Sequence, residues 1–442
     1  MLSHEQNELM CRIGPGTPMG EAFRRYWLPI CQTSDIPTPE SDPFPLEILG
    51  QKLVVFRNAD GELGVLDQFC LHRRVSLAIG RCEGDGIRCL YHGWKFAVDG
   101  TVLETPNVND PEFKHRVKAE AYPVREAGGM IWSYFGPKAA MPAFPHFPWF
   151  DVESRHRLNV YALNNCNYVQ ALEALVDSSH LNILHTDGLR ASGQLQDLNF
   201  AAAAEMTFDA APTIEVDDTD FGFQYAAIRG GSDADGSETL HVRITAFSGP
   251  CFITNPNEDL FMCMVPINDE QCIHFHVFWH PERPMGEEPL RGNMLRHVGL
   301  DEDALRAYNM TYDSFNEPGR PAPRNRFKQN RDAIRAGGFS GFHSFTQEDA
   351  AVNVSPGAIK DRSKEVLAPV DMAVSRLYRF LIGAAQAVEG GGEPIGVDAD
   401  QMRIFGRNAT IPKGEDWRSL VPTHKVTRRF RPAKGGRGQQ AA

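Results

Sequence analysis

The chain has 442 residues and a formal net charge of -12, because 57 Asp and Glu outweigh 45 Lys and Arg. This acidic total argues against a general nucleic-acid-binding protein, since affinity for phosphate comes from Lys and Arg. The cysteines number 9, and an odd count excludes a complete set of internal disulfides. The start has no signal-peptide pattern, and no run of about 18 apolar residues occurs, so we expect a cytoplasmic protein without a membrane partner.

The first third of the chain is typical of a short arm followed by a small all-β domain. Residues 1–26 predict a helical arm that is broken by glycines and prolines at 14–18. Over residues 27–140, short apolar or alternating runs are separated by turn signals such as Val98-Asp-Gly-Thr101, which is typical of antiparallel strands. A stiff linker is then predicted by four prolines: Pro137, Pro142, Pro145 and Pro148.

A second domain is expected over residues 150–423. Apolar residues at helical spacing predict a helix over 164–185, and an amphipathic helical region closes the domain at 361–388. Residues 281–345 form a long insertion with little periodicity, and such a length is often functional. A basic tail follows at 424–442. Between the two helical regions, antiparallel strands are predicted at 221–228, 240–247, 259–265 and 272–279.

Two short motifs in the all-β domain each pair one cysteine with one histidine. Cys70-Leu-His72 and Cys89-Leu-Tyr-His92 lie in loops between predicted strands. Thiolates from the two cysteines can hold one iron of a [2Fe-2S] cluster, and neutral imidazoles from the two histidines can hold the other. A structural zinc site is the alternative, but zinc fingers usually begin with two closely spaced cysteines. The mixed pairing is therefore typical of a Rieske cluster.

On these residues the chain resembles a known family, the oxygenase α subunits of Rieske non-haem iron ring-hydroxylating systems. The matching stretches are 70–74 and 88–100, and Leu71 departs from the proline that the family usually has there. The resemblance is to the phthalate 4,5-dioxygenase-like branch and covers residues from about 20 to about 420. It implies an α+β fold with an N-terminal all-β Rieske domain and a helix-grip (START-like) catalytic domain around an antiparallel sheet.

A second constellation lies in the first predicted helix, where Asp177, His180 and His185 are closely spaced. On an ideal helix the two histidines sit about 140° apart, so both can reach one ion only if the helix bends or ends between them. From spacing alone, capping and ordinary polar helix residues explain these side chains equally well. The resemblance assigns His180 and His185 as iron ligands, and it assigns Asp177 as the catalytic bridge to a Rieske histidine of a neighbouring subunit.

A ferrous oxygenase needs two histidines and one carboxylate, which leaves coordination positions open for dioxygen and substrate. The segment Thr346-Gln-Glu-Asp349 resembles the part of the family that carries this carboxylate, and the resemblance assigns Asp349. Glu348 is the competitor, and it would lie on another face of a helix. Without the resemblance, two acids near a helix start need no ligand role.

Candidate substrate contacts lie on the predicted strands. In the phthalate-like branch, pocket arginines grip carboxylates, because a guanidinium can bind a carboxylate with two parallel hydrogen bonds. Arg243 and Arg229 are the candidates here, with a structural salt bridge as the alternative. The alternating His274, His276 and His280 imitate a metal site, but no carboxylate or cysteine accompanies them at ligand spacing. We interpret these histidines as sheet surface or pocket wall.

The resemblance implies the terminal oxygenase component of a multicomponent Rieske system in aromatic hydrocarbon catabolism. Its cofactors would be a [2Fe-2S] cluster and a mononuclear Fe(II) that activates O2 to hydroxylate an aromatic compound, with an aromatic acid and phthalate-like cis-dihydroxylation favoured. No nicotinamide or flavin motif occurs, so NAD(P)H-derived electrons would come from a flavin/iron-sulfur reductase or through a ferredoxin. A homotrimer or a dimer of trimers is implied, since a neighbour's cluster can then lie close to the iron.

Three alternatives remain at this point. The same iron can hydroxylate a methoxy or N-alkyl carbon, which makes the chain an O- or N-dealkylating (demethylating) monooxygenase. A Rieske electron carrier without catalysis would need no second iron. A ligand-binding protein with a structural zinc would need no cluster at all.

Overall fold

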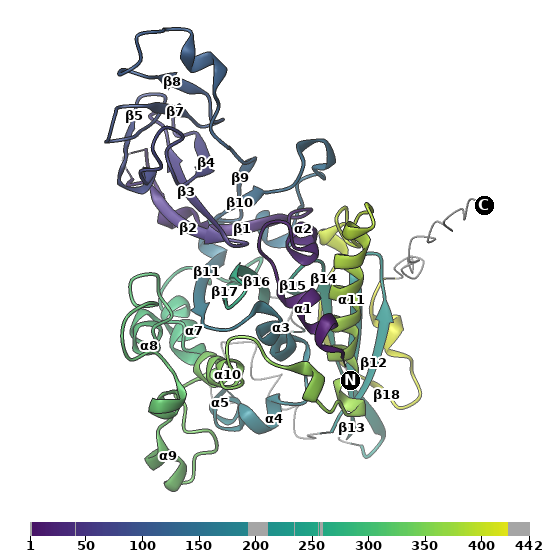
Figure 1. The fold of residues 1–442 in the computed structure, drawn as a ribbon. Helices are drawn as coiled ribbons and strands as arrows, with labels where there is room; N and C mark the ends of the chain where they lie inside the picture. The colour runs from purple at the N-terminus through teal and green to yellow at the C-terminus, as the bar shows by residue number, and fades with distance from the viewer. Residues whose placement is uncertain are drawn as a thin grey trace, which may run out of the picture.

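The computed structural model describes residues 2–39, 41–192, 211–233, 235–254, 256 and 260–422, and it consists of two bodies (Figure 1). The smaller upper body is all-β, and the larger lower body combines helices with antiparallel strands. The predicted α+β class is therefore confirmed. Among the described residues, no helix is long and apolar enough to cross a membrane.

The upper body contains three small antiparallel sheets among the described residues. Its strands are short and are joined by tight turns, as the frequent turn signals predict. The first sheet has the order β1 (Trp27–Gln32), β10 (Met130–Tyr134), β9 (Val124–Ala127). The second has the order β2 (Phe44–Ile48), β3 (Gln51–Arg57), β4 (Leu63–Asp67). The third has the order β5 (Arg81–Glu83), β6 (Gly86–Arg88), β7 (Lys95–Ala97), β8 (Val102–Glu104).

Strand β3 is buried on both faces because it lies between two hydrophobic cores. Successive side chains of a strand point to opposite faces. Val54 and Phe56 enter the core of the upper body, whereas Leu53 and Val55 enter the large core that continues into the lower body. The β2–β3 turn is also tied to the lower body, because the backbone N–H of Gly50 donates to the carbonyl of Ile267 at 2.7 Å. The two bodies thus share a continuous core, and β1, β2 and this turn contact β16 (Leu260–Asn268).

The lower body is built on an eight-stranded antiparallel sheet of the described residues. All four predicted strands are present, and two of them form a longer hairpin than predicted. The segment Gly230–Ser232 stays paired with Glu238–Leu240, so the turn is shorter than its glycines indicate. The path is β11 (Arg157–Asn164), β17 (Gln271–Trp279), β16 (Leu260–Asn268), β15 (Phe252–Thr254), β14 (Glu238–Ser248), β13 (Gly222–Ser232), β12 (Thr213–Asp218), and β18 (Arg407–Pro412) pairs with β14.

Helix α11 (Met372–Glu389) lies alongside this sheet and contacts the N-terminal helices (Figure 1). It begins later than predicted, because two short 3-10 turns, Arg362–Lys364 and Pro369–Asp371, come before the helix starts. Its buried face repeats at helical spacing with Leu377, Leu381 and Ala384. The predicted N-terminal arm packs against this face as α1 (His4–Cys11) and α2 (Pro18–Phe23), separated by the expected glycine and proline break.

The segment 281–345 contains helices that its weak periodicity did not predict. These are α7 (Leu290–Val298), α8 (Glu302–Ala307) and α9 (Arg331–Arg335), and α10 (Phe345–Val354) begins at its end. Each is only one to three turns long, so the apolar repeat that identifies a helix is barely established. Helix α7 ends where Gly299 adopts φ 75°, the left-handed conformation that favours glycine at a helix end.

Candidate cluster and iron sites

The two Cys/His motifs form a pair of loops with the same backbone pattern. The N–H of Cys70 donates to the carbonyl of Val75 and that of Cys89 to the carbonyl of Trp94. In each loop a second bond returns to the cysteine carbonyl, from Arg74 in one and from Gly93 in the other. Both of these residues have positive φ, 56° and 73°, which closes each loop tightly. The sequence therefore builds two matching loops that face each other.

The side chains of these loops converge as a cluster ligand set requires. Cys70 and Cys89 are both buried, and the rings of His72 and His92 lie 4.6 Å apart between centroids. His72 stacks on Trp94 at 4.7 Å, and its buried Nδ1 has no hydrogen-bond partner. Burial raises the pKa of the Cys70 thiol to about 11, so its thiolate form needs a cationic partner. Two thiols on one side and two imidazoles on the other fit a Rieske [2Fe-2S] cluster.

The predicted helix over 164–185 is interrupted, and the interruption shapes the second site. Helix α3 (Tyr168–Val176) ends before Asp177, which has extended backbone angles of φ -99° and ψ 114°. The Asp177 carboxylate accepts from both the N–H and the hydroxyl of Ser179, each at 2.7 Å. Such local bonds compete with the helical pattern and turn the chain.

Beyond this turn, His180 and His185 bracket the single-turn helix α4 (Leu181–Leu184). Helix α5 (Thr186–Ser192) follows directly. The separation expected on a continuous helix is thereby removed, and the two imidazole centroids lie 5.0 Å apart. Nδ1 of His180 lies 3.4 Å from the Asp177 carboxylate. Asp177 therefore lies next to Nδ1 of His180, on the ring nitrogen other than the one near Asp349.

Helix α10 brings Asp349 to the two histidines. Its Oδ1 lies 3.2 Å from Nε2 of His185 and 3.8 Å from Nε2 of His180. One ligand atom from each of the three residues lies within 4.8 Å of the others. The Asp349 Oδ1 atom is buried and has no hydrogen-bond partner. A donor set of two imidazoles and one carboxylate fits a mononuclear non-haem iron.

Glu348, the competing carboxylate, faces the other side of the same histidine. Its Oε2 lies 2.6 Å from Nδ1 of His185, and Ser340 donates its hydroxyl to Oε1. The side chains of His185 and Glu348 are only 3% and 4% exposed. A proton on Nδ1 that is donated to Glu348 leaves Nε2 free to bind a metal. This role was missed in the sequence, because adjacent helix positions reveal only that two acids point in different directions.

A cavity of about 1120 Å³, its open mouth included, adjoins His180, His185 and Asp349. Arg243 lines it from β14, with its Nε buried and unpartnered, and burial lowers the pKa of this guanidinium to about 10. Arg229, on the neighbouring strand β13, donates from Nη2 to the carbonyl of Ser178 at 3.1 Å. The two arginines thus differ: one lines the cavity, and the other contacts the turn that carries Asp177.

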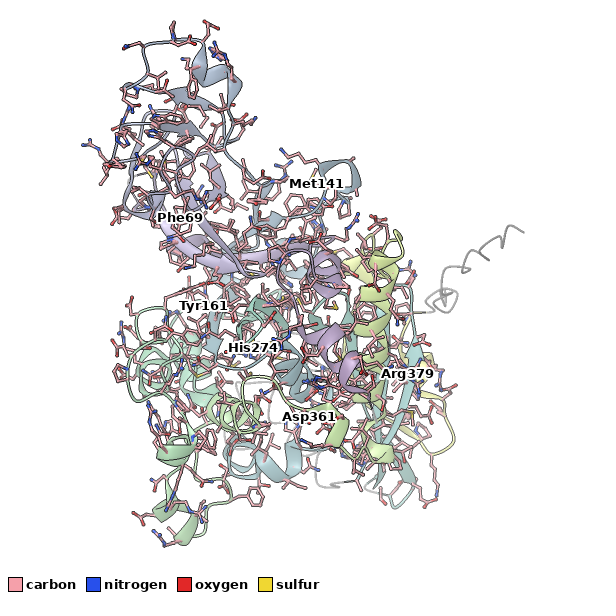
Figure 2. All side chains as sticks on the ribbon, in the orientation of Figure 1. Phe69, Met141, Tyr161, His274, Asp361 and Arg379 are labelled. Carbon is pink, nitrogen blue, oxygen red and sulfur yellow. The ribbon has the colours of Figure 1, made fainter. Side chains whose placement is uncertain are left out.

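His274 and His276 also line the cavity, on the same face of β17. Their ring centroids are 3.6 Å apart, and Figure 2 labels His274 in the lower body. Burial and the neighbouring His276 lower the pKa of His274 well below its ordinary value. The pocket-wall interpretation of these two histidines agrees with this position, whereas His280 lies beyond the end of the strand.

Comparison with known families divides the chain in the same way as the two bodies. Residues 26–123 match the Rieske [2Fe-2S] domain, and residues 133–434 match the family described as LigXa C-terminal domain like. Dicamba monooxygenase, in complex with dicamba, has a similar fold: the TM-score is 0.55 with 16% identity, over 84% of this chain and 99% of that chain. NdmA of Pseudomonas putida CBB5 has a TM-score of 0.55 with 16% identity, over 90% and 99%.

Curated relatives match over nearly the full length. The phthalate 4,5-dioxygenase oxygenase subunit of Pseudomonas putida is 36% identical over 95% of this chain and 94% of the relative. The 3-chlorobenzoate-3,4-dioxygenase oxygenase subunit of Comamonas testosteroni is 33% identical over 93% and 96%. The chain therefore belongs to the Rieske non-haem iron oxygenases, in the phthalate 4,5-dioxygenase-like branch, as an oxygenase subunit with a [2Fe-2S] cluster and a mononuclear iron.

Proposed function

We propose that this chain is the terminal oxygenase component that hydroxylates an aromatic acid, by cis-dihydroxylation of the ring. The observation that carries this proposal is Arg243, a buried cation on the wall of a largely apolar cavity beside His180, His185 and Asp349. A guanidinium in such a place binds a carboxylate strongly, because little water competes for it. The two most similar relatives named above are dioxygenases whose names specify aromatic acids, phthalate and 3-chlorobenzoate.

Each predicted ligand has a distinct task in this proposal. Cys70, Cys89, His72 and His92 hold the cluster, and His180, His185 and Asp349 hold the iron. When bound, the cluster supplies single electrons and the iron supplies the activation of dioxygen. Asp177 orients His180 from behind and connects the site to the surface of the subunit. Arg243 fixes the acid group, so that the aromatic ring lies against the apolar wall near the iron ligands. Direct substrate binding by Arg229 stays a prediction.

We further propose a homotrimer, or a dimer of trimers, in which the cluster of one subunit serves the iron of its neighbour. Within one chain the cluster loops belong to the upper body, whereas α4 and α10 lie in the lower body (Figure 1). Exposed apolar side chains flank the cluster at Leu71, Leu90 and Tyr91. Others, Val352 and Val366, line a surface depression that reaches Asp177 and His180. Two such surfaces can cover each other in neighbouring subunits.

The domain bounds in this proposal are 27–140 for the Rieske domain and 150–423 for the catalytic domain, with the arm 1–26 and the basic tail 424–442 outside them.

The relatives are oxygenase subunits, which by name are parts of larger systems. The electron donor that we propose is a flavin/iron-sulfur reductase that oxidises NAD(P)H, directly or through a ferredoxin.

The test of the reaction is product analysis with the purified protein, a reductase and NAD(P)H, using a panel of aromatic acids and aryl ethers. We expect cis-diols from aromatic acids. Formaldehyde release from methoxy compounds would instead support O-demethylation, which has a specific basis here: a 5,5'-dehydrodivanillate O-demethylase oxygenase subunit of Sphingobium is 35% identical over 65% of this chain. If neither class of compound is converted, the proposed function is wrong.

Asp177→Asn tests the bridging role. The amide keeps the shape of the side chain but loses the charge that faces His180, so we expect both metal centres to remain and turnover to fall about 10- to 100-fold or more. Iron content, the cluster absorbance and turnover should be measured on the same sample. Near-normal turnover in this variant would show that the carboxylate has no role in electron transfer.

A further inference from the structure

The substrate cavity has one cationic side chain among its described lining residues, which is Arg243. Arg229 on the next strand is directed to the carbonyl of Ser178 instead. Among residues 190–210, whose side chains lie outside the described part, the sequence contains one cation, Arg190. A buried carboxylate without a cationic partner is strongly unfavourable. The described cavity wall can therefore neutralise the negative charge of one substrate carboxylate.

A second polar feature of the cavity wall is the imidazole pair of His274 and His276. Nε2 of His274 and Nδ1 of His276 are buried, and neither atom has a hydrogen-bond partner. A neutral imidazole offers one N–H donor and one acceptor nitrogen. Buried polar atoms without partners cost free energy that a ligand with a matching group recovers. The pair is therefore suited to a neutral oxygen substituent that can donate or accept a hydrogen bond.

The rest of the wall is suited to an aromatic ring. Met262 and Met264 lie on β16 opposite His276 and His274 in the antiparallel register. Both methionines and Phe278 line the same cavity. Thioether and aromatic side chains make favourable contacts with a ring and adapt to its outline. The ring can thus lie between the guanidinium and the imidazole pair.

We propose that the substrate is an aromatic monocarboxylate that also carries a hydroxyl or ether oxygen. Arg243 binds the carboxylate, and His274 with His276 binds the neutral oxygen. This inference rests on the proposed function and narrows it, because a second carboxylate finds no cation on the described wall. The substrate class therefore differs from the dicarboxylate that the name of the phthalate 4,5-dioxygenase relative specifies.

Anaerobic equilibrium binding to the full-length holoprotein tests this proposal without turnover. Isothermal titration should compare benzoate, 3- and 4-hydroxybenzoate, 3- and 4-methoxybenzoate, phthalate and isophthalate. We expect at least one hydroxy- or methoxybenzoate to bind about tenfold or more tightly than benzoate and than both dicarboxylates, as one or more added hydrogen bonds predict. Comparison of the hydroxybenzoates with the methoxybenzoates shows whether the site prefers a hydroxyl or an ether oxygen.

Variants separate the two halves of the site. Arg243→Gln should weaken all the acids by about tenfold or more, whereas His274→Phe should abolish the preference for the oxygen substituent and leave benzoate affinity nearly unchanged. Arg376→Gln, which alters an arginine that pairs with Asp218 and does not line the cavity, is the control and should leave the order of affinities unchanged. Phthalate binding as tightly as the best hydroxy- or methoxybenzoate would overturn the monocarboxylate assignment. An unchanged preference in His274→Phe would overturn the imidazole subsite. If no aromatic acid binds, the proposed function itself fails.

Discussion

At the scale of single residues, the iron site depends on how one histidine is oriented. His185 has Asp349 near its Nε2 and Glu348 on its Nδ1, at 3.2 Å and 2.6 Å. A carboxylate on the far nitrogen of a metal-binding histidine fixes both the tautomer and the ring orientation. Glu348 is itself held by the Ser340 hydroxyl. We therefore expect Glu348 to position His185, although the sequence alone left Glu348 as a competitor of Asp349 for the ligand role.

Removal of this hydrogen bond should weaken iron binding. We expect Glu348→Ala to lower the affinity for Fe(II) by about 10- to 100-fold, since His185 loses its orienting partner. The measurement is a competition titration with a chromophoric chelator, which needs no turnover. Glu348→Gln keeps an amide oxygen that can accept from Nδ1 and should restore part of the affinity.

Ser340→Ala is the matched control for this prediction. It removes only the outer hydroxyl that supports Glu348, so its effect on Fe(II) affinity should be smaller than that of Glu348→Ala. Equal Fe(II) affinity in Glu348→Ala and the unaltered protein would contradict the positioning role.

At the scale of helices and strands, α3 is held in place by a buried ion cluster. Glu173, one turn before Asp177, accepts from the Tyr378 hydroxyl on α11 at 2.7 Å and from Lys360 at 2.5 Å. It also accepts from Arg362, which in turn donates to Asn7 on α1 at 3.1 Å. The cluster thus joins α1, α3 and α11 next to the turn that carries Asp177.

Loss of Glu173 should destabilise the protein strongly. The Arg362 and Glu173 side chains are 0% and 11% exposed, so Glu173→Ala leaves a buried guanidinium without its carboxylate. Breaking such a pair costs about 3–5 kcal/mol. The measurement is the shift in the midpoint of thermal or urea unfolding.

Arg376→Gln is the control for the ion cluster. Arg376 pairs with Asp218, and their side chains are 25% and 46% exposed. The loss of an exposed pair costs about 0–1 kcal/mol, so the unfolding midpoint should move little. Similar shifts in Glu173→Ala and Arg376→Gln would show that burial does not strengthen the cluster.

The sequence could predict those parts of the site whose residues lie close together along the chain. Each Cys/His motif lies within a single loop, so the proposed ligand set could be predicted from the chain without tertiary information. The prediction of Asp349 as the third ligand needed the family resemblance, because this residue lies on a helix far along the chain. The cavity role of His274 and His276 could not be derived, since strand alternation predicts a shared face and not what covers that face. The helices of 281–345 were missed because they are too short for periodicity.

At the scale of the whole molecule, the proposed assembly separates the two metal centres of a functional pair between two chains. A Cys89→Ala variant should lack the cluster and an Asp349→Ala variant should lack the iron, so each should be inactive alone. We expect activity to return when the two variants are expressed together and assemble as mixed trimers. Each active junction then combines the intact cluster of one subunit with the intact iron site of the next.

The measurement is turnover per trimer after purification with two different affinity tags. The control is a mixture of the two separately purified variants under conditions that prevent subunit exchange, which should stay inactive. Mixed trimers that are as inactive as the separate variants would contradict electron transfer between subunits.

The packing of β3 has a consequence for how this enzyme works. Because Leu53 and Val55 belong to the large core that continues into the lower body, a hinge between the bodies would have to open that core to water. Exposure of such buried side chains is costly, so we expect the Rieske domain and the catalytic domain to move as one piece. We therefore expect that a chain does not bring its own cluster close to its own iron. In the proposed trimer, the rate at which electrons reach the iron depends on the contact between subunits, so dilution that separates the subunits should slow turnover.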